Sequence, residues 1–362
     1  MLFALDRRTA SSPISSSAEE RVDRRFFLTA ALSVFASALF GCSGAPGATV
    51  TRPPPQPPKP LAIPSLDVLV PLPGLRWLVV ARPREIASIA WLEPSIAMLI
   101  DKARLDRFAQ LMGFDLRAVP EASWAAYRNE AEADDISLQL VRHATDPLVV
   151  ERLFRDRLSS DVLRAVDDPR VVRASGRIGK TVHAFAAIGR DVVCFQQEGS
   201  ADRGPCRVVT LLALGKLKRT RRVFDDEALH VLAKRLESAP LRAFAPGPFE
   251  GELARGARGL LAAATAVGAA ARPTRRESVL IEMVVAGDFS KSGDEASRRL
   301  AASWEDVASR PFGHLLGLDA PLSPAVASHM PDVVTLVVEL DPRKLAKGLA
   351  DATSNQIRDI MR

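Results

Sequence analysis

The sequence predicts an α+β protein in which two related β–α–β–α units, at about residues 75–166 and 279–362, flank a mainly antiparallel β region at about 167–278. Two observations predict this arrangement. Runs of strand length alternate with helical patterns near both ends of the chain, and short β-rich runs separated by glycines fill the middle. A hydrophobic share of 47% over 362 residues is sufficient for a sizeable core in one large or two smaller domains.

The first unit is predicted to contain strands and helices in alternation: strands at 75–81 and 136–143, and helices at 83–99, 105–112 and 147–166. Gly113 follows the second helix directly and suits a left-handed C-cap. Asp146-Pro147 combines a residue that caps a helix with one that favours its first turn, so a helix is expected to begin there.

A short pattern in the first unit returns in the second. Phe-x-x-Leu-x-Gly-x-Asp occurs at 108–115 and again at 312–319, each time downstream of an apolar run. An Asp-Pro pair then follows a β-rich run in both places, at 146–147 and at 341–342. These matches predict an internal duplication, with a strand at 279–286 and a C-terminal helix at 341–360. The alternative is a chance recurrence of common helix-end chemistry.

The middle region is predicted to form antiparallel hairpins with strands at 171–174, 181–188, 191–197 and 207–214. Cys194 and Cys206 flank a polar loop between the last two of these strands. In an oxidising compartment such a pair predicts a disulfide, and the alternative is two buried free thiols. The alanine-rich segment at 259–271 has only 13 residues and is expected to be a packed helix.

No motif in the chain specifies a reaction. Ala174 to Thr181 fits a permissive phosphate-loop pattern, but the residues from Thr181 onward have strand character, so a glycine turn is expected instead of a nucleotide site. The five histidines lack the close spacing of metal ligands, and the sequence predicts neither a metal nor a cofactor. Three acidic doublets, at 134–135, 167–168 and 225–226, are interpreted as caps and loop residues.

A basic segment follows the last predicted strand of the middle region. Five of its seven residues are cationic: Lys216, Lys218, Arg219, Arg221 and Arg222. These side chains could contact anionic headgroups or another anionic envelope polymer, and the alternative is a solvated loop. The net charge of +6 is mild for the whole chain and does not indicate a nucleic-acid partner.

The N-terminus has the organisation of an export signal: a charged lead at 1–25, an apolar run from Phe26 to Phe40, and Gly41 directly before Cys42. As a helix the run would be about 22 Å long, against a bilayer core of about 30 Å, so it fits a removed signal better than a permanent span. The alternatives are an uncleaved anchor or a buried Cys42.

Two motifs make this signal specific. Asp23-Arg24-Arg25-Phe26-Phe27-Leu28-Thr29 resembles a twin-arginine export motif, and Leu39-Phe40-Gly41-Cys42 resembles a lipobox. Together they resemble the precursor of a bacterial lipoprotein. The resemblance covers only residues 1–42. It implies removal of residues 1–41, lipidation of Cys42, and anchoring to the inner or outer membrane with the protein facing the periplasm or the cell surface.

Residues 42–64 are rich in proline and are predicted to be an extended tether between the lipid and a globular region at 65–362. We expect that region to have a continuous fold of ferredoxin-like character. Its expected role is non-catalytic, as a binding or assembly module whose partners are the membrane and another envelope protein or polymer. The alternative is an exported hydrolase whose site assembles from distant residues.

Overall fold

The computed structural model describes residues 59, 61–129 and 135–360. The chain divides into two units, 1–56 and 57–362, and every described residue belongs to the second. The predicted signal peptide, the lipidation site at Cys42 and most of the tether therefore lie outside the described residues. Within the described part, no helix is long and apolar enough to cross a membrane.

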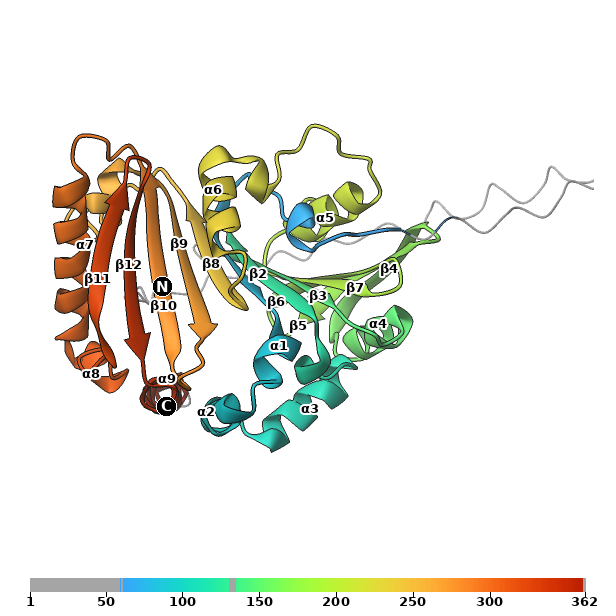
Figure 1. Cartoon of the computed structure of the whole chain (residues 1–362). Helices are drawn as coiled ribbons and strands as arrows, with labels where there is room; N and C mark the ends of the chain where they lie inside the picture. The colour runs from blue at the N-terminus through green and yellow to red at the C-terminus, as the bar shows by residue number, and fades with distance from the viewer. Residues whose placement is uncertain (1–58, 60, 130–134, 361–362) are drawn as a thin grey trace, which may run out of the picture. The chain divides into compact units, whose positions relative to one another are not determined.

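The second unit is a mixed α+β structure built on one large sheet (Figure 1). The described strands are β1 (Leu75–Ala81), β2 (Glu121–Tyr127), β3 (Ile136–Arg142), β4 (Ser160–Asp168), β5 (Val171–Ile178), β6 (Thr181–Ile188), β7 (Val192–Gln197), β8 (Leu241–Pro246), β9 (Ala264–Pro273), β10 (Val279–Gly287), β11 (Ser323–Met330) and β12 (Val333–Leu340). They form a 12-stranded sheet in the order β11-β12-β10-β9-β8-β1-β2-β3-β7-β6-β5-β4. Every pairing between these strands is antiparallel.

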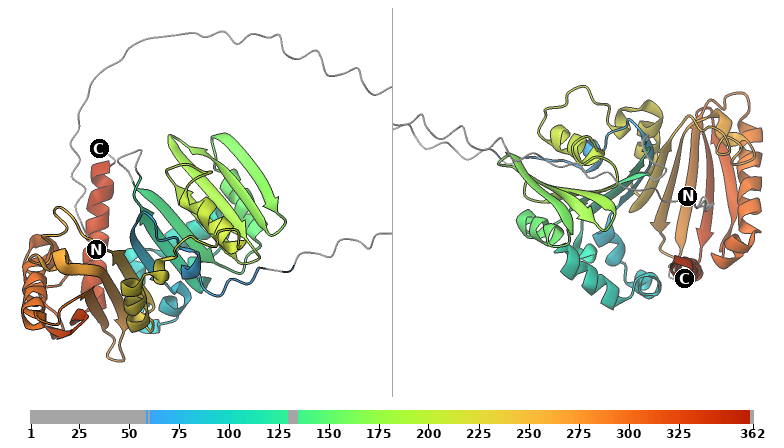
Figure 2. Two further views of the ribbon diagram at one scale, coloured as in Figure 1. Left: turned by 90° about the horizontal axis from the view of Figure 1, so that it is seen from above. Right: turned by 180° about the vertical axis from the view of Figure 1, so that it is seen from behind.

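Helices cover both faces of this sheet (Figures 1 and 2). The described α-helices are α1 (Pro83–Ala87), α2 (Glu93–Leu99), α3 (Lys102–Met112), α4 (Pro147–Arg155), α5 (Pro205–Ala213), α6 (Glu227–Leu236), α7 (Gly293–Ala308), α8 (Pro311–Leu315) and α9 (Pro342–Ile360). Short 3-10 helices lie at η1 (Asp67–Leu69), η2 (Ala90–Leu92), η3 (Leu116–Ala118), η4 (Val223–Asp225) and η5 (Leu260–Ala263).

Alternation along the strands explains why both faces are covered. In β7, Cys194 belongs to a core cluster with α5 and α6, whereas its neighbours Val193 and Phe195 pack with α4 on the opposite face. In β12, Val333 joins the first cluster and Val334 packs towards α7. Strands buried on both faces need apolar residues at nearly every position, which is the pattern of these β-rich runs.

The two predicted units share their order of elements but not their strand order. Each has a strand, helices, a hairpin and a final helix that begins at Asp-Pro. In the sheet, however, the first unit runs β1-β2-β3 and the second runs β10-β12-β11. The ferredoxin-like arrangement is not confirmed in either, and the internal duplication stays a prediction.

Three predicted elements were wrong. The predicted strand at 207–214 is helix α5, the predicted helix at 259–271 is η5 followed by strand β9, and the predicted helix to Val166 ends at Arg155 and is followed by strand β4. By contrast, the phosphate-loop pattern forms the β5–β6 hairpin, with Gly179 at φ 62° between two strands. The predicted glycine turn is therefore confirmed.

Candidate functional site: an apolar cavity between α1, α2 and α9

The basic segment lies in the loop between α5 and α6, where all five cationic residues are exposed. The backbone N–H of Leu72 donates to the carbonyl of Arg221 (2.9 Å), and Pro71 forms an isolated β-bridge with Arg222. The basic loop is thereby fixed beside the segment through which the chain enters the folded unit.

The two cysteines are neighbours, although the elements that carry them differ from those predicted. Cys194 lies in β7 and Cys206 lies in the first turn of α5, and both are buried free thiols in this structure. A hydrogen bond joins their side chains, and together with burial it holds the pKa of Cys194 well above its ordinary value; burial is the larger cause. Their oxidation to a disulfide stays a prediction.

The acidic doublets have structural partners where their side chains are described. Asp135 forms an ion pair with Arg76 (2.8 Å), Asp168 pairs with Arg170 (2.8 Å), and Asp226 caps α6 through the N–H of Leu229. Asp134 lies outside the described residues. In the part of the chain that the structure covers, no group of three or more His, Cys, Asp or Glu side chains is placed to hold a metal ion.

A strongly apolar cavity lies where the ends of several strands meet α1, α2 and the first turns of α9. It measures about 210 Å³. Helices α2 and α9 lie next to each other there, as Figure 1 also shows. The ends of β8, β9 and β10 contribute the floor through Leu241, Ala271 and Val279.

Sequence and helix geometry together explain the cavity wall. Spacings of three and four residues place one row of large aliphatic side chains towards α9: Ile86, Ile89, Leu92, Ile96 and Leu99. This is the apolar periodicity that predicted a helix at 83–99. The row is carried on α1, on the 3-10 helix η2 with the residue before it, and on α2, instead of on one helix. Helix α1 ends at Ala87, and α2 begins at Glu93 with Pro94 in its first turn. From α9, Leu345, Ala346 and Leu349 complete the wall.

One polar side chain interrupts this lining. Ser95 is 4% exposed, lies on α2, and its Oγ has no hydrogen-bond partner among the described residues. The cavity lining otherwise consists of Ile, Leu, Val, Ala and Pro, without an aromatic ring or a charge. Because a buried hydroxyl without a partner costs about 1–3 kcal/mol, Ser95 marks a place where a ligand's polar atom would be favourable.

Apolar surface continues from the cavity to the outside of α2. Met98, Leu99 and Ile100 are 48%, 37% and 40% exposed, and Leu99 also lines the cavity. Sequence periodicity identified the aliphatic row but not the cavity, because the opposite wall comes from α9, some 250 residues later in the chain.

No protein-family model matches the sequence, and no curated protein matches it. Among solved structures, the chain is similar to TP0453 in its crystal form III, with 11% identity and a TM-score of 0.46 over 80% of this chain and 99% of that one. It is similar to TP0453 in crystal form I as well, with 9% identity and a TM-score of 0.44 over 80% of this chain and 98% of that one.

Proposed function

We propose that this protein is an exported, lipid-anchored binding module without catalytic activity, and that it binds an aliphatic chain in the cavity between α1, α2 and α9. The observation that carries the proposal is the all-aliphatic lining with one buried, unpartnered hydroxyl, that of Ser95. The alternative of an exported hydrolase needs converging acid and base groups. This cavity is lined by no titratable side chain.

The lining favours an acyl chain over an aromatic ligand or a peptide. Aromatic ligands are commonly held by stacking on aromatic side chains, and peptides need partners for their backbone N–H and C=O groups. Neither is present in the cavity. Each buried CH₂ group contributes about 0.8 kcal/mol, so a medium-length chain would gain about 5 kcal/mol before the cost of ordering it.

Ser95 would bind a polar end of the ligand. A carboxyl or ester oxygen at the head of the chain would accept a hydrogen bond from Ser95 Oγ and remove the cost of leaving it unpartnered. The ligand is therefore an amphiphile with an unbranched apolar tail and an oxygen-bearing head.

Binding is tested by titrating decanoate into the protein and measuring heat, with decyl-ammonium and a short aromatic carboxylate for comparison. The Ala346→Leu change fills the cavity, whereas Ala97→Leu adds the same atoms on an exposed part of α2. We expect decanoate binding that Ala346→Leu reduces at least about tenfold and Ala97→Leu leaves unchanged. Ser95→Ala should weaken it by about fivefold or more.

Circular dichroism would show that each variant is folded. The absence of any decanoate binding to the unaltered protein would contradict the proposal. Binding that survives Ala346→Leu unchanged would place the ligand elsewhere. Tighter binding of the aromatic carboxylate than of decanoate would show that the ligand is not an acyl chain.

The basic loop supports a contact of the same module with an anionic membrane surface. Its five cationic side chains are exposed and lie beside Pro71 and Leu72, near the start of the described fold. Each basic residue near such a surface contributes about 1 kcal/mol. Replacing Lys216, Lys218 and Arg219 by Gln should therefore lower sedimentation of the residue 59–362 fragment with phosphatidylglycerol vesicles and not with phosphatidylcholine vesicles. Equal sedimentation before and after the change would favour a solvated loop.

The anchor is tested separately by the intact mass of protein extracted from membranes. A diacyl or triacyl mass that starts at Cys42, absent from a Cys42→Ala variant, is the expected result. An unlipidated full-length product would contradict both the anchor and the proposed location.

A further inference from the structure

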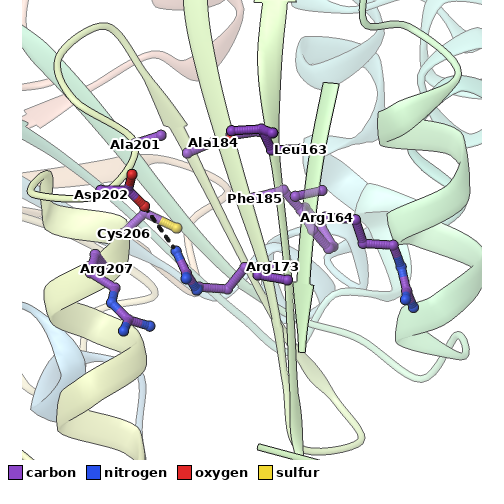
Figure 3. A pocket seen from close by; sticks show the side chains of 12 residues that line it. Leu163, Arg164, Arg173, Ala184, Phe185, Ala201, Asp202, Cys206 and Arg207 are labelled. Carbon is purple, nitrogen blue, oxygen red and sulfur yellow. Dashed lines mark ion pairs between the residues drawn. The ribbon is translucent and has the colours of Figure 1, made fainter. Parts of the chain in front are cut away.

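A second cavity, unrelated to the proposed ligand site, opens onto Cys206. It measures about 220 Å³ and lies between strands β4, β5 and β6 on one side and the start of α5 on the other (Figure 3). Cys206 lines it from the first turn of α5, with Asp202 from the preceding loop.

The two sulfurs are related asymmetrically to this cavity. Cys194 is fully enclosed in β7, where it pairs with Leu140 of β3 and Ala186 of β6. Cys206 is 2% exposed but forms part of the cavity wall. A disulfide-bearing molecule in the cavity would therefore meet Cys206 first, and Cys194 would reach it only through Cys206.

The backbone around the pair is held without an S–S bond. Gln196, which is buried, donates from Nε2 to the carbonyls of Glu198 (3.0 Å) and Ser200 (3.2 Å). Its Oε1 accepts from the backbone N–H of Cys206 (2.9 Å). These three hydrogen bonds fix the β7–α5 loop and the first turn of α5 against β7, so the thiols stay adjacent whether or not a covalent bond joins them.

Three arginines, Arg164, Arg173 and Arg207, also line this cavity. Arg173 pairs with Asp202 at 3.5 Å (Figure 3), and Arg164 pairs with the buried Glu151 at 3.1 Å. The wall beside Cys206 is therefore polar.

We propose that Cys194 and Cys206 form a reversible dithiol–disulfide pair, and that Cys206 is the sulfur that exchanges with small disulfides in this cavity. In the first step the Cys206 thiolate attacks one sulfur of the disulfide, a mixed disulfide forms at Cys206, and the other half leaves as a thiolate. The enclosed Cys194 thiol then attacks the Cys206 sulfur, and its proton passes to the departing sulfur. The second half of the small disulfide leaves as a thiol, and the protein has lost two electrons to the disulfide.

The test uses reduced protein and oxidised glutathione as the probe, with acid quenching and intact-mass analysis. The unaltered protein should lose two hydrogens, with a glutathione adduct that appears early and maps to Cys206. Cys194→Ser should accumulate that adduct, whereas Cys206→Ser should react at least about tenfold more slowly.

Early adducts on Cys194 of the unaltered protein, or a wild-type protein that keeps both thiols under excess oxidised glutathione, would overturn the proposal. Both of these outcomes are measured on the unaltered protein, so they test the proposal even if a cysteine variant fails to fold.

Discussion

His143 connects the stability of the fold to pH. It is 4% exposed and stacks on Phe114, with ring centroids 5.1 Å apart and an interplanar angle of 9°. Burial lowers the pKa of His143 and outweighs the opposing effect of Asp191. The pKa of His183 is lowered as well, first by burial and then by the charge of Arg157. Both side chains are therefore more easily protonated in the unfolded chain than in the folded protein.

We predict that the free energy of unfolding falls as the solution is acidified below pH about 6.5, the ordinary pKa of histidine. Below that pH the unfolded state binds protons that the folded state excludes, so stability is present above it and is lost as the pH drops towards the folded pKa values. Urea unfolding between pH 8 and pH 5 measures the slope. His143→Leu should reduce the slope, and His230→Leu, on the outer side of α6, should leave it unchanged.

Residue chemistry predicted several local features correctly, because the responsible atoms are close in sequence. Gly113 and Gly317 both have positive φ, at 80° and 70°, directly after α3 and near the end of α8. Asp146 and Asp341 accept hydrogen bonds from the backbone N–H groups two residues later. The free hydroxyl of Ser95 could not be predicted in this way, since its surroundings come from distant parts of the chain.

At the scale of elements, the sequence-based predictions were wrong where the usual secondary-structure preference of the residues differed from what tertiary packing requires. In α5, the β-branched residues Val208, Val209 and Thr210 favoured a strand, but Pro205 begins a helix whose buried stripe includes Cys206, Val209 and Thr210. In β9, alanines favoured a helix, but Leu232 and Leu236 of α6 pack so closely on Gly268 that a Cβ there would lie 2.9 Å from Leu236. Small residues are needed in a strand beneath such a contact.

Glu282 links α6 to the sheet through ion pairs, and we predict that its negative charge stabilises the fold. This buried carboxylate on β10 pairs with Arg235 of α6 (3.1 Å) and Arg272 of β9 (2.8 Å). Glu282→Gln keeps the shape but weakens both pairs, so unfolding free energy should fall by about 1–3 kcal/mol.

Chemical denaturation would measure this loss beside a surface control. Glu295 also pairs with two arginines, Arg298 and Arg299, but all three side chains are about half exposed or more. Glu295→Gln should therefore cost much less than Glu282→Gln. Equal losses in the two variants would show that burial does not strengthen the Glu282 pairs.

At the scale of the folded unit, one core cluster extends from Leu66 to Val333 and reaches nearly from one edge of the sheet to the other, from β5 to β12. The α+β class and the antiparallel middle were predictable from alternation. It was not predictable that both units would join in one sheet. That joining depends on β8, which lies between β1 and β9, and β8 has few residues with a clear alternating pattern.

We predict that residues 61–360 unfold in one cooperative transition. Trp77, Trp91 and Trp124 lie towards one end of the chain, and Trp304 lies in α7. In a Trp304→Phe variant, and in one that keeps only Trp304, fluorescence and far-UV circular dichroism should have the same midpoint in urea. A continuous hydrogen-bonded sheet gives no boundary at which half could unfold alone. Two separated midpoints in either variant would instead indicate two independently folding halves.

The irregular outer strands have a consequence for crowding. β4 and β11 form the two edges, and each departs from regular register: β4 near Ser160 and Ala165, and β11 between Ser323 and Val326, with Pro324 inside it. Bulges and prolines at sheet edges hinder a neighbouring chain from adding a further strand. Despite the exposed valines and leucine of these strands, many copies could therefore lie close together without growing into fibres.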